Sequence, residues 1–173
     1  MFDLKSMSER SGQLSRFLNM VVEAAVATLL GLLVLDVWLA VMDRYLFHWQ
    51  LPWPEVLARY LMIWAALLAA SSGIARREHI GLSVLIRRFP GGARKSVLVA
   101  VDLVTLALFV YLVIYGVGFA QKGESRQAMI LGLSLLLPFA AVPASAALCA
   151  IQTVLVGIRD LGHYTVETQG GEA

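Results

Sequence analysis

Charged residues are scarce in this chain of 173 residues. They make up 15% of the sequence, against 59% hydrophobic residues and a mean hydropathy of +0.75. Soluble domains carry about 25% charged residues, and a chain of this size cannot hide so much apolar surface in its interior. The shortage of charge therefore excludes a soluble enzyme and a disordered chain, and it indicates a membrane protein.

Cysteine and histidine are also scarce, which excludes several kinds of site. The single cysteine, Cys149, cannot form an intrachain disulfide and lies in an apolar run. The histidines, His48, His79 and His163, all fall between or beyond the apolar runs, which excludes haem ligation by histidines on two spans. No Cys/His cluster has metal spacing, and no Gly-rich phosphate loop occurs. We therefore expect no enzymatic activity, no cofactor, no metal site and no nucleic-acid partner.

Four long apolar runs dominate what is present, at about residues 17–42, 55–75, 96–121 and 129–158. Each reaches the ~20 residues that a helix needs to cross ~30 Å of hydrocarbon, and a helix satisfies its own backbone in lipid. We predict an all-α membrane protein with one four-helix transmembrane domain over residues 1–162 and a flexible polar tail at 163–173. The first run is too long for a cleaved signal peptide, so we expect a retained anchor. Pro138 and Pro143 predict a kink or local irregularity in the fourth run.

The basic residues are unevenly divided between the two sides of these spans. One side has Lys5, Arg10, Arg16, Arg76, Arg77, Arg87, Arg88, Arg94, Lys95 and Arg159, whereas the other has only Arg44, Lys122 and Arg126. Cytoplasmic connections carry the excess of lysine and arginine in membrane proteins. We therefore predict that both termini and the connection between spans two and three are cytoplasmic.

That second connection contains a short amphipathic pattern. Leu82, Leu85, Ile86 and Phe89 follow the i, i+3, i+4, i+7 spacing of one helix face. We predict a helix over about residues 80–89 that lies on the membrane surface and contacts lipid headgroups through its arginines. An ordinary positive loop is the alternative.

Four ionisable residues fall within the spans, namely Glu23, Asp36, Arg59 and Asp102. Such residues are costly in lipid and are functional candidates by default. Asp36 and Arg59 can lie at similar depth and form an ion pair, but Glu55 also competes for Arg59 from one helical turn away. Water, a headgroup or another chain could serve as the partner of Asp102. The acids do not form a continuous chain across the membrane, so pairing, snorkelling or a subunit contact is favoured over a proton or ion relay.

Small residues are concentrated in spans two and four, where they allow helix backbones to approach closely. In span two these residues are Ala65, Ala66, Ala69, Ala70, Ser71, Ser72 and Gly73, and in span four Ala140, Ala141, Ala144, Ser145, Ala146 and Ala147. Four helices have too few mutual faces to cover every polar and small surface. We therefore expect a second membrane protein to pack on some of them.

One stretch of the sequence resembles a known family. It consists of the motif Trp53-Pro54-Glu55, then Arg59 and Trp64, and the segment 76–80 that contains His79. It is similar to the small membrane subunit of tripartite ATP-independent periplasmic (TRAP) transporters. Family members have four spans, a Trp/Glu signature that opens the second span, an arginine one turn later and a His-Ile pair after it. Two positions depart from the pattern, because Ser83 stands where an acid is common and Ala69 where a glycine is common.

The resemblance implies a non-catalytic subunit in the bacterial inner membrane. Such a subunit binds and stabilises the scaffold of a large permease subunit of about 12 spans, which imports organic acids with sodium and is fed by a periplasmic binding protein. By the same resemblance, Glu55 and Arg59 hold the outer end of span two, to each other or against span one. His79 anchors its cytoplasmic end, while Trp53 and Trp64 anchor the span at the interface or pack in its core.

Three alternatives remain from the sequence alone. One is the small subunit of another tripartite carboxylate transporter, which shares the size and the number of spans. Another is an autonomous small exporter that works as a dimer and uses Glu23 as its coupling acid. The third is a membrane anchor of a redox complex, against which the lack of intramembrane histidine argues.

Overall fold

Long helices make up the protein in the computed structural model, which describes the backbone of residues 4–76, 91–124 and 134–170 and the side chains of residues 9–76, 96–124 and 134–160. In these segments the order is α1 (Leu4–Met42), η1 (Asp43–Phe47), α2 (Pro54–Ala75), α4 (Gly91–Glu124) and α5 (Leu136–Gly170). The element η1 is a π-helical turn at the end of α1. The four α-helices are long and apolar enough to cross a membrane, which confirms the predicted all-helical membrane fold.

Several helices are longer than the predicted spans. α1 begins at Leu4 instead of near residue 17, and its 39 residues, at ~1.5 Å each, exceed the ~30 Å of hydrocarbon. α5 continues to Gly170, where a flexible tail was predicted from residue 163. Extending an existing helix is easy because each added residue gains a hydrogen bond. The predicted surface helix at residues 80–89 lies outside the described residues.

The two prolines of the fourth span are accommodated within one continuous helix. α5 begins at Leu136, later than the predicted start near residue 129, so Pro138 lies in the first turn. A missing N–H is harmless there, because the first N–H groups of a helix have no intrahelical acceptor. Pro143 lies inside the helix, and α5 continues through it.

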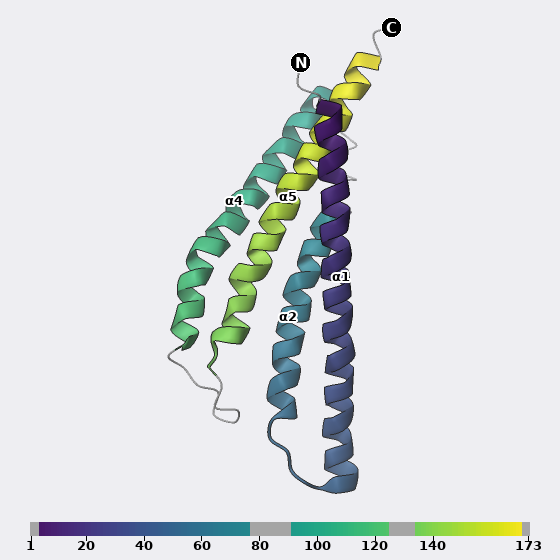
Figure 1. The fold of residues 1–173 in the computed structure, drawn as a ribbon. Coiled ribbons are helices and arrows are strands. Elements are labelled where there is room, and N and C mark those ends of the chain that lie inside the picture. Colours follow the sequence, from purple (N-terminus) through teal and green to yellow (C-terminus); the bar gives the residue numbers. More distant parts are fainter. Residues whose placement is uncertain (1–3, 77–90, 125–133, 171–173) are drawn as a thin grey trace.

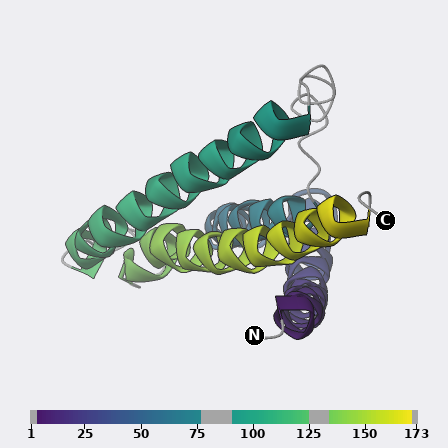
Figure 2. The ribbon, with the colours of Figure 1, turned by 90° about the horizontal axis from the view of Figure 1, so that it is seen from above.

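The helices form two antiparallel pairs that diverge toward one end (Figure 1). α1 packs with α2, and α4 packs with α5. We call the end where residues 43–53 connect α1 to α2 the turn end, and the end with both chain termini the terminal end. α5 contacts the other three helices, whereas α4 contacts only α5 among the described helices (Figure 2).

A face of small and polar residues places α5 at the centre. Ala141, Ser145, Cys149, Gln152 and Val156 recur at three- or four-residue spacing and are all buried. This periodicity is that of one helix face. Small residues allow close backbone approach where hydrophobicity alone does not drive helices together.

Two glycines allow α4 to pack closely against α5. A Cβ atom on Gly123 would lie 2.8 Å from the backbone oxygen of Leu135, and one on Gly116 would lie 3.2 Å from the Cβ of Pro143. The rings of Phe119 and Phe139 stack between these points, with centroids 4.4 Å apart. The lack of a side chain at two positions, two turns apart, thus sets the distance between these helices.

Candidate partner-binding site

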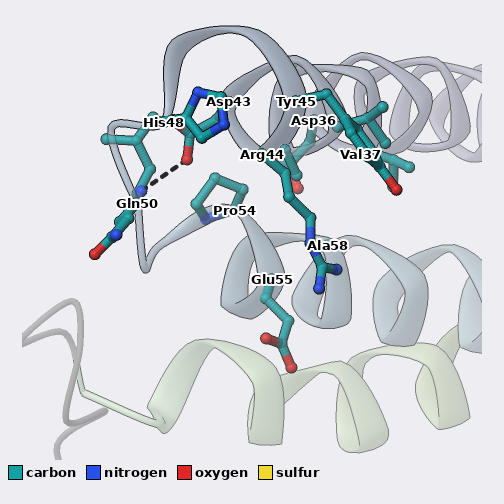
Figure 3. A pocket seen from close by; sticks show the side chains of 13 residues that line it. Asp36, Val37, Asp43, Arg44, Tyr45, His48, Gln50, Pro54, Glu55 and Ala58 are labelled. Atoms are coloured by element: carbon teal, nitrogen blue, oxygen red, sulfur yellow. Dashed lines mark hydrogen bonds between the residues drawn. The ribbon is translucent and has the colours of Figure 1, made fainter.

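The turn end is built around a buried aspartate. Asp43 begins η1, and its carboxylate accepts backbone hydrogen bonds from Trp49 (2.7 Å) and Leu51 (2.8 Å). Figure 3 shows the second of these bonds. The backbone oxygen of Asp43 accepts a third bond from His48, whose φ of 58° places it in the left-handed region. Short polar side chains commonly satisfy reversing backbone in this way. Asp43 therefore fixes the connection that leads into α2.

A cleft of about 710 Å³ opens between the end of α1, η1 and the first turns of α2. Asp36 lines it and is only 7% exposed. Its carboxylate interacts with the backbone amide of Ala58, but neither oxygen meets hydrogen-bond geometry with any group in the described segments. Arg44 extends from η1 across the cleft toward Ala58 (Figure 3). The cleft thus holds a buried acid with an exposed base nearby.

Arg59 pairs with Glu55 on its own helix, at 3.1 Å, and Asp36 takes no part in an ion pair in the described segments. The Arg59 and Glu55 side chains are 61% and 85% exposed. A surface pair spaced by one helical turn contributes only about 0.3–0.5 kcal/mol. The pair therefore does little for the fold of this chain, and both side chains are accessible at the turn end.

The two tryptophans of the motif lie on α2 and at its start. Trp53 is half-buried directly before Pro54, and its backbone oxygen accepts a bond from Leu57 at 3.0 Å. The indole N–H of Trp64 donates to the backbone oxygen of Leu137 on α5, at 3.2 Å. Trp64 therefore links α2 to the first turn of α5, a contact between residues 73 positions apart.

Glu23, at the middle of α1, is the centre of a polar cluster beside the C-terminal end of α2. Its Oε1 atom accepts hydrogen bonds from Asn19 Nδ2 (2.8 Å) and Ser72 Oγ (3.0 Å). The guanidinium of Arg76 donates to the same oxygen and forms an ion pair with Glu23. Ser72 lies on α2 and Arg76 directly follows it, so the cluster joins α1 to α2.

A second polar contact joins α1 to α5. Ser15 Oγ donates to Gln152 Oε1 at 2.8 Å, and Gln152 Nε2 donates to the backbone oxygen of Ser15 at 3.3 Å. Both residues are almost completely buried. The site residues predicted from the sequence do not include Ser15, Gln152 or Asp43. A polar side chain within an apolar run is the signal that could have identified the first two, and an aspartate at the end of such a run could have identified the third.

The remaining predicted site residues lie toward the terminal end or outside the described residues. Asp102 is half-buried on α4, and one of its carboxylate oxygens faces Gly157 on α5. His79 lies outside the described residues. The structure thus groups Asp36, Trp53, Glu55 and Arg59 near the turn end, and it places Asp102 apart from them.

One side of α2 exposes a row of small residues. Ala66, Ala69 and Ala70 are exposed, and a Cβ atom added to Gly73 would meet no atom within 4 Å. Their spacing of three or four residues places them on one helix face. By contrast, Ala65, Ser71 and Ala75 on the same helix are buried within the chain. The small residues of span two therefore divide into a face used internally and a face left open.

Comparison with known proteins gives a consistent result. Residues 33–162 match the family described as tripartite ATP-independent periplasmic transporters, DctQ component. A TRAP transporter small permease protein of Haemophilus influenzae is 31% identical over 103 residues, which cover 60% of this chain and 63% of that protein. The C4-dicarboxylate TRAP transporter small permease protein DctQ of Vibrio cholerae is 33% identical over 91 residues, 53% of this chain and 38% of that protein. The sialic acid TRAP transporter small permease protein SiaQ of the same organism is 23% identical over 121 residues, 70% of each chain.

The matched region contains the features described above. It begins within α1 and ends within α5, and it includes the cleft, the Trp53 motif and most of the central helix α5. Its relatives are transporter subunits and not enzymes. With its four helices long and apolar enough to cross a membrane, the chain therefore belongs to the DctQ-component family of TRAP transporters, the small permease subunits.

Proposed function

We propose that this chain binds the fixed scaffold of a large permease subunit and stabilises it, without a substrate site of its own. The large subunit would import an organic acid together with sodium, and a periplasmic binding protein would deliver the substrate. Two relatives carry the names of organic acids, a C4-dicarboxylate and sialic acid, which supports this substrate class. Both chain termini lie at one end of the bundle, consistent with the proposed cytoplasmic location of both in a bacterial inner membrane.

The observation that carries this proposal is the open small-residue face of α2, formed by Ala66, Ala69, Ala70 and Gly73. Small residues spaced by about one turn form tight helix interfaces in membranes, because the backbones can approach closely. No helix in the described segments covers this face. We propose that a helix of the large subunit packs on it.

The other predicted site residues have supporting roles in the proposed function. Trp53 anchors the start of α2 at the outer membrane interface, where indoles are favoured. Glu55 and Arg59 hold each other on the surface of α2 and are accessible to a partner. Trp64 fixes α2 against α5, which orients the open face. His79 and Asp102 would anchor the cytoplasmic ends of their spans.

The test is to fill the open face with a large side chain. A Cβ atom at Gly73 meets no atom within 4 Å in the described segments, and Gly73→Leu also replaces glycine by a better helix former. We expect this variant to fold in detergent as the native subunit does, yet to lose co-purification with the large permease subunit and to lose uptake by the assembled transporter.

Two other glycines provide matched variants. A Cβ atom on Gly118 of α4 or on Gly31 of α1 also meets no atom within 4 Å. Gly118→Leu should leave assembly intact, because Gly118 is surrounded on its face by the large side chains of Ile114 and Tyr115. Retention of the complex by Gly73→Leu, with loss in Gly31→Leu, would assign the interface to α1 and overturn the proposal for α2.

A further inference from the structure

Asp36 is a buried acid on α1 that lines the cleft at the turn end. It is 7% exposed, and neither carboxylate oxygen is in hydrogen-bond geometry with any group in the described segments. Burial of a charged group is costly unless a partner of opposite charge or a set of donors compensates. Asp36 nevertheless lines a cleft of about 710 Å³ that is open to the surroundings of the chain. The position is therefore suited to a cation that enters from outside.

The other charged side chains of the cleft are either paired within the chain or available to a ligand. The Asp43 carboxylate is occupied by two backbone N–H groups, and Glu55 pairs with Arg59. Arg44 is exposed, and its side chain crosses the cleft toward Ala58, whose backbone amide also faces Asp36 (Figure 3). An available base and an available acid thus approach the same part of α2, which matches a ligand with one negative and one positive group.

The cleft is bordered by an apolar groove of about 350 Å³ on the surface of α1. Val37, Trp38, Val41 and Met42 line this groove, and two of them, Val37 and Val41, also line the cleft. Trp38 is 68% exposed. The site thus combines a polar part, which has one acidic and one basic side chain, with an adjoining apolar groove. An amphiphile fits such a site better than a polar protein loop does.

We propose that the cleft at the turn end binds the headgroup of an aminophospholipid of the phosphatidylethanolamine type. Its primary ammonium, with three N–H donors, would bind the Asp36 carboxylate. Its phosphate would bind the guanidinium of Arg44, whose fork of donors matches phosphate oxygens. An acyl chain would lie along the groove formed by Val37, Trp38, Val41 and Met42.

The experiment uses the purified full chain in detergent and measures lipid binding by native mass spectrometry. The probes are phosphatidylethanolamine, its N-methylated derivatives and phosphatidylcholine, with identical acyl chains. We expect the unmodified protein to bind phosphatidylethanolamine about ten-fold or more tightly than phosphatidylcholine. Stepwise N-methylation should weaken binding progressively, because each methyl group removes an N–H donor for Asp36. Equal affinity for the two lipids would overturn the proposal without any mutation.

Two variants then distinguish the contribution of the amine to lipid binding from that of the phosphate. Asp36→Asn keeps the side-chain shape and should abolish the preference for the primary amine. Arg44→Gln, at an exposed position, should weaken the binding of both lipids to the same extent. Glu9→Gln removes an exposed acid from α1 far from the cleft and should change neither. If Asp36→Asn leaves lipid binding unchanged but prevents co-purification with the large subunit, a basic side chain of the partner occupies the cleft and the lipid assignment is wrong.

Discussion

The contact between Ser15 and Gln152 offers a direct test of how α5 holds the bundle together. Gln152 is fully buried, and its amide makes two hydrogen bonds to Ser15 on α1, at 2.8 and 3.3 Å. Gln152→Leu keeps a similar volume and removes both bonds, so the change isolates the polar contact from cavity formation. An interhelical hydrogen bond in a membrane protein contributes about 0.6 kcal/mol on average and up to about 1.7 kcal/mol. Two bonds therefore predict a loss of about 1–2 kcal/mol.

The assay is reversible unfolding of the purified subunit in mixed micelles, followed by circular dichroism. Thr153→Val is the matched control, because Thr153 is adjacent and buried but its hydroxyl donates to Cys149 within α5, at 2.8 Å. We expect the control to change stability by less than about 0.5 kcal/mol. Ser15→Ala completes a double-mutant cycle, in which the coupling with Gln152→Leu should be about 0.5–1 kcal/mol. An unchanged or increased stability of Gln152→Leu, or a coupling near zero, would refute the claim that this contact holds α1 to α5.

Substitutions at two further residues, Asp43 and Glu23, test the remaining polar clusters. Asp43→Ala removes the acceptor of two backbone hydrogen bonds in the connection to α2, and it should lower the free energy of unfolding by about 2–3 kcal/mol in the same assay. Asp43→Asn keeps one acceptor oxygen and should lower it by about half as much. Equal losses for the two variants would contradict the proposed geometry. Glu23→Gln weakens the cluster that joins α1 to α2, so the melting temperature should fall relative to Glu9→Gln. Liposomes that contain only this chain should show no proton-coupled efflux with or without the substitution, and efflux that disappears in Glu23→Gln would instead support the autonomous exporter.

Much of the site near α2 could be predicted because its residues are close in sequence. Glu55 and Arg59 are four residues apart, so their contact follows from helix geometry alone once α2 is recognised. The contact of Trp64 with Leu137 and that of Glu23 with Arg76 could not be predicted in this way, since helix packing brings together residues 73 and 53 positions apart. The sequence left open whether Arg59 pairs with Asp36, and only the tertiary arrangement directs Arg59 toward Glu55 and leaves Asp36 without an ion pair in the described segments.

The sequence by itself determined the number of membrane helices and the class of protein, because the length of an uncharged apolar run is a local property that lipid thickness converts directly into a span. The family motif around Trp53 is likewise local. Only the tertiary structure decided that α5 is central, that α4 contacts α5 alone among the described helices, and that one small-residue face of α2 is buried while another stays open. These outcomes depend on which faces meet. In lipid that choice follows from close packing and polar contacts between distant residues, for which apolar periodicity carries no signal.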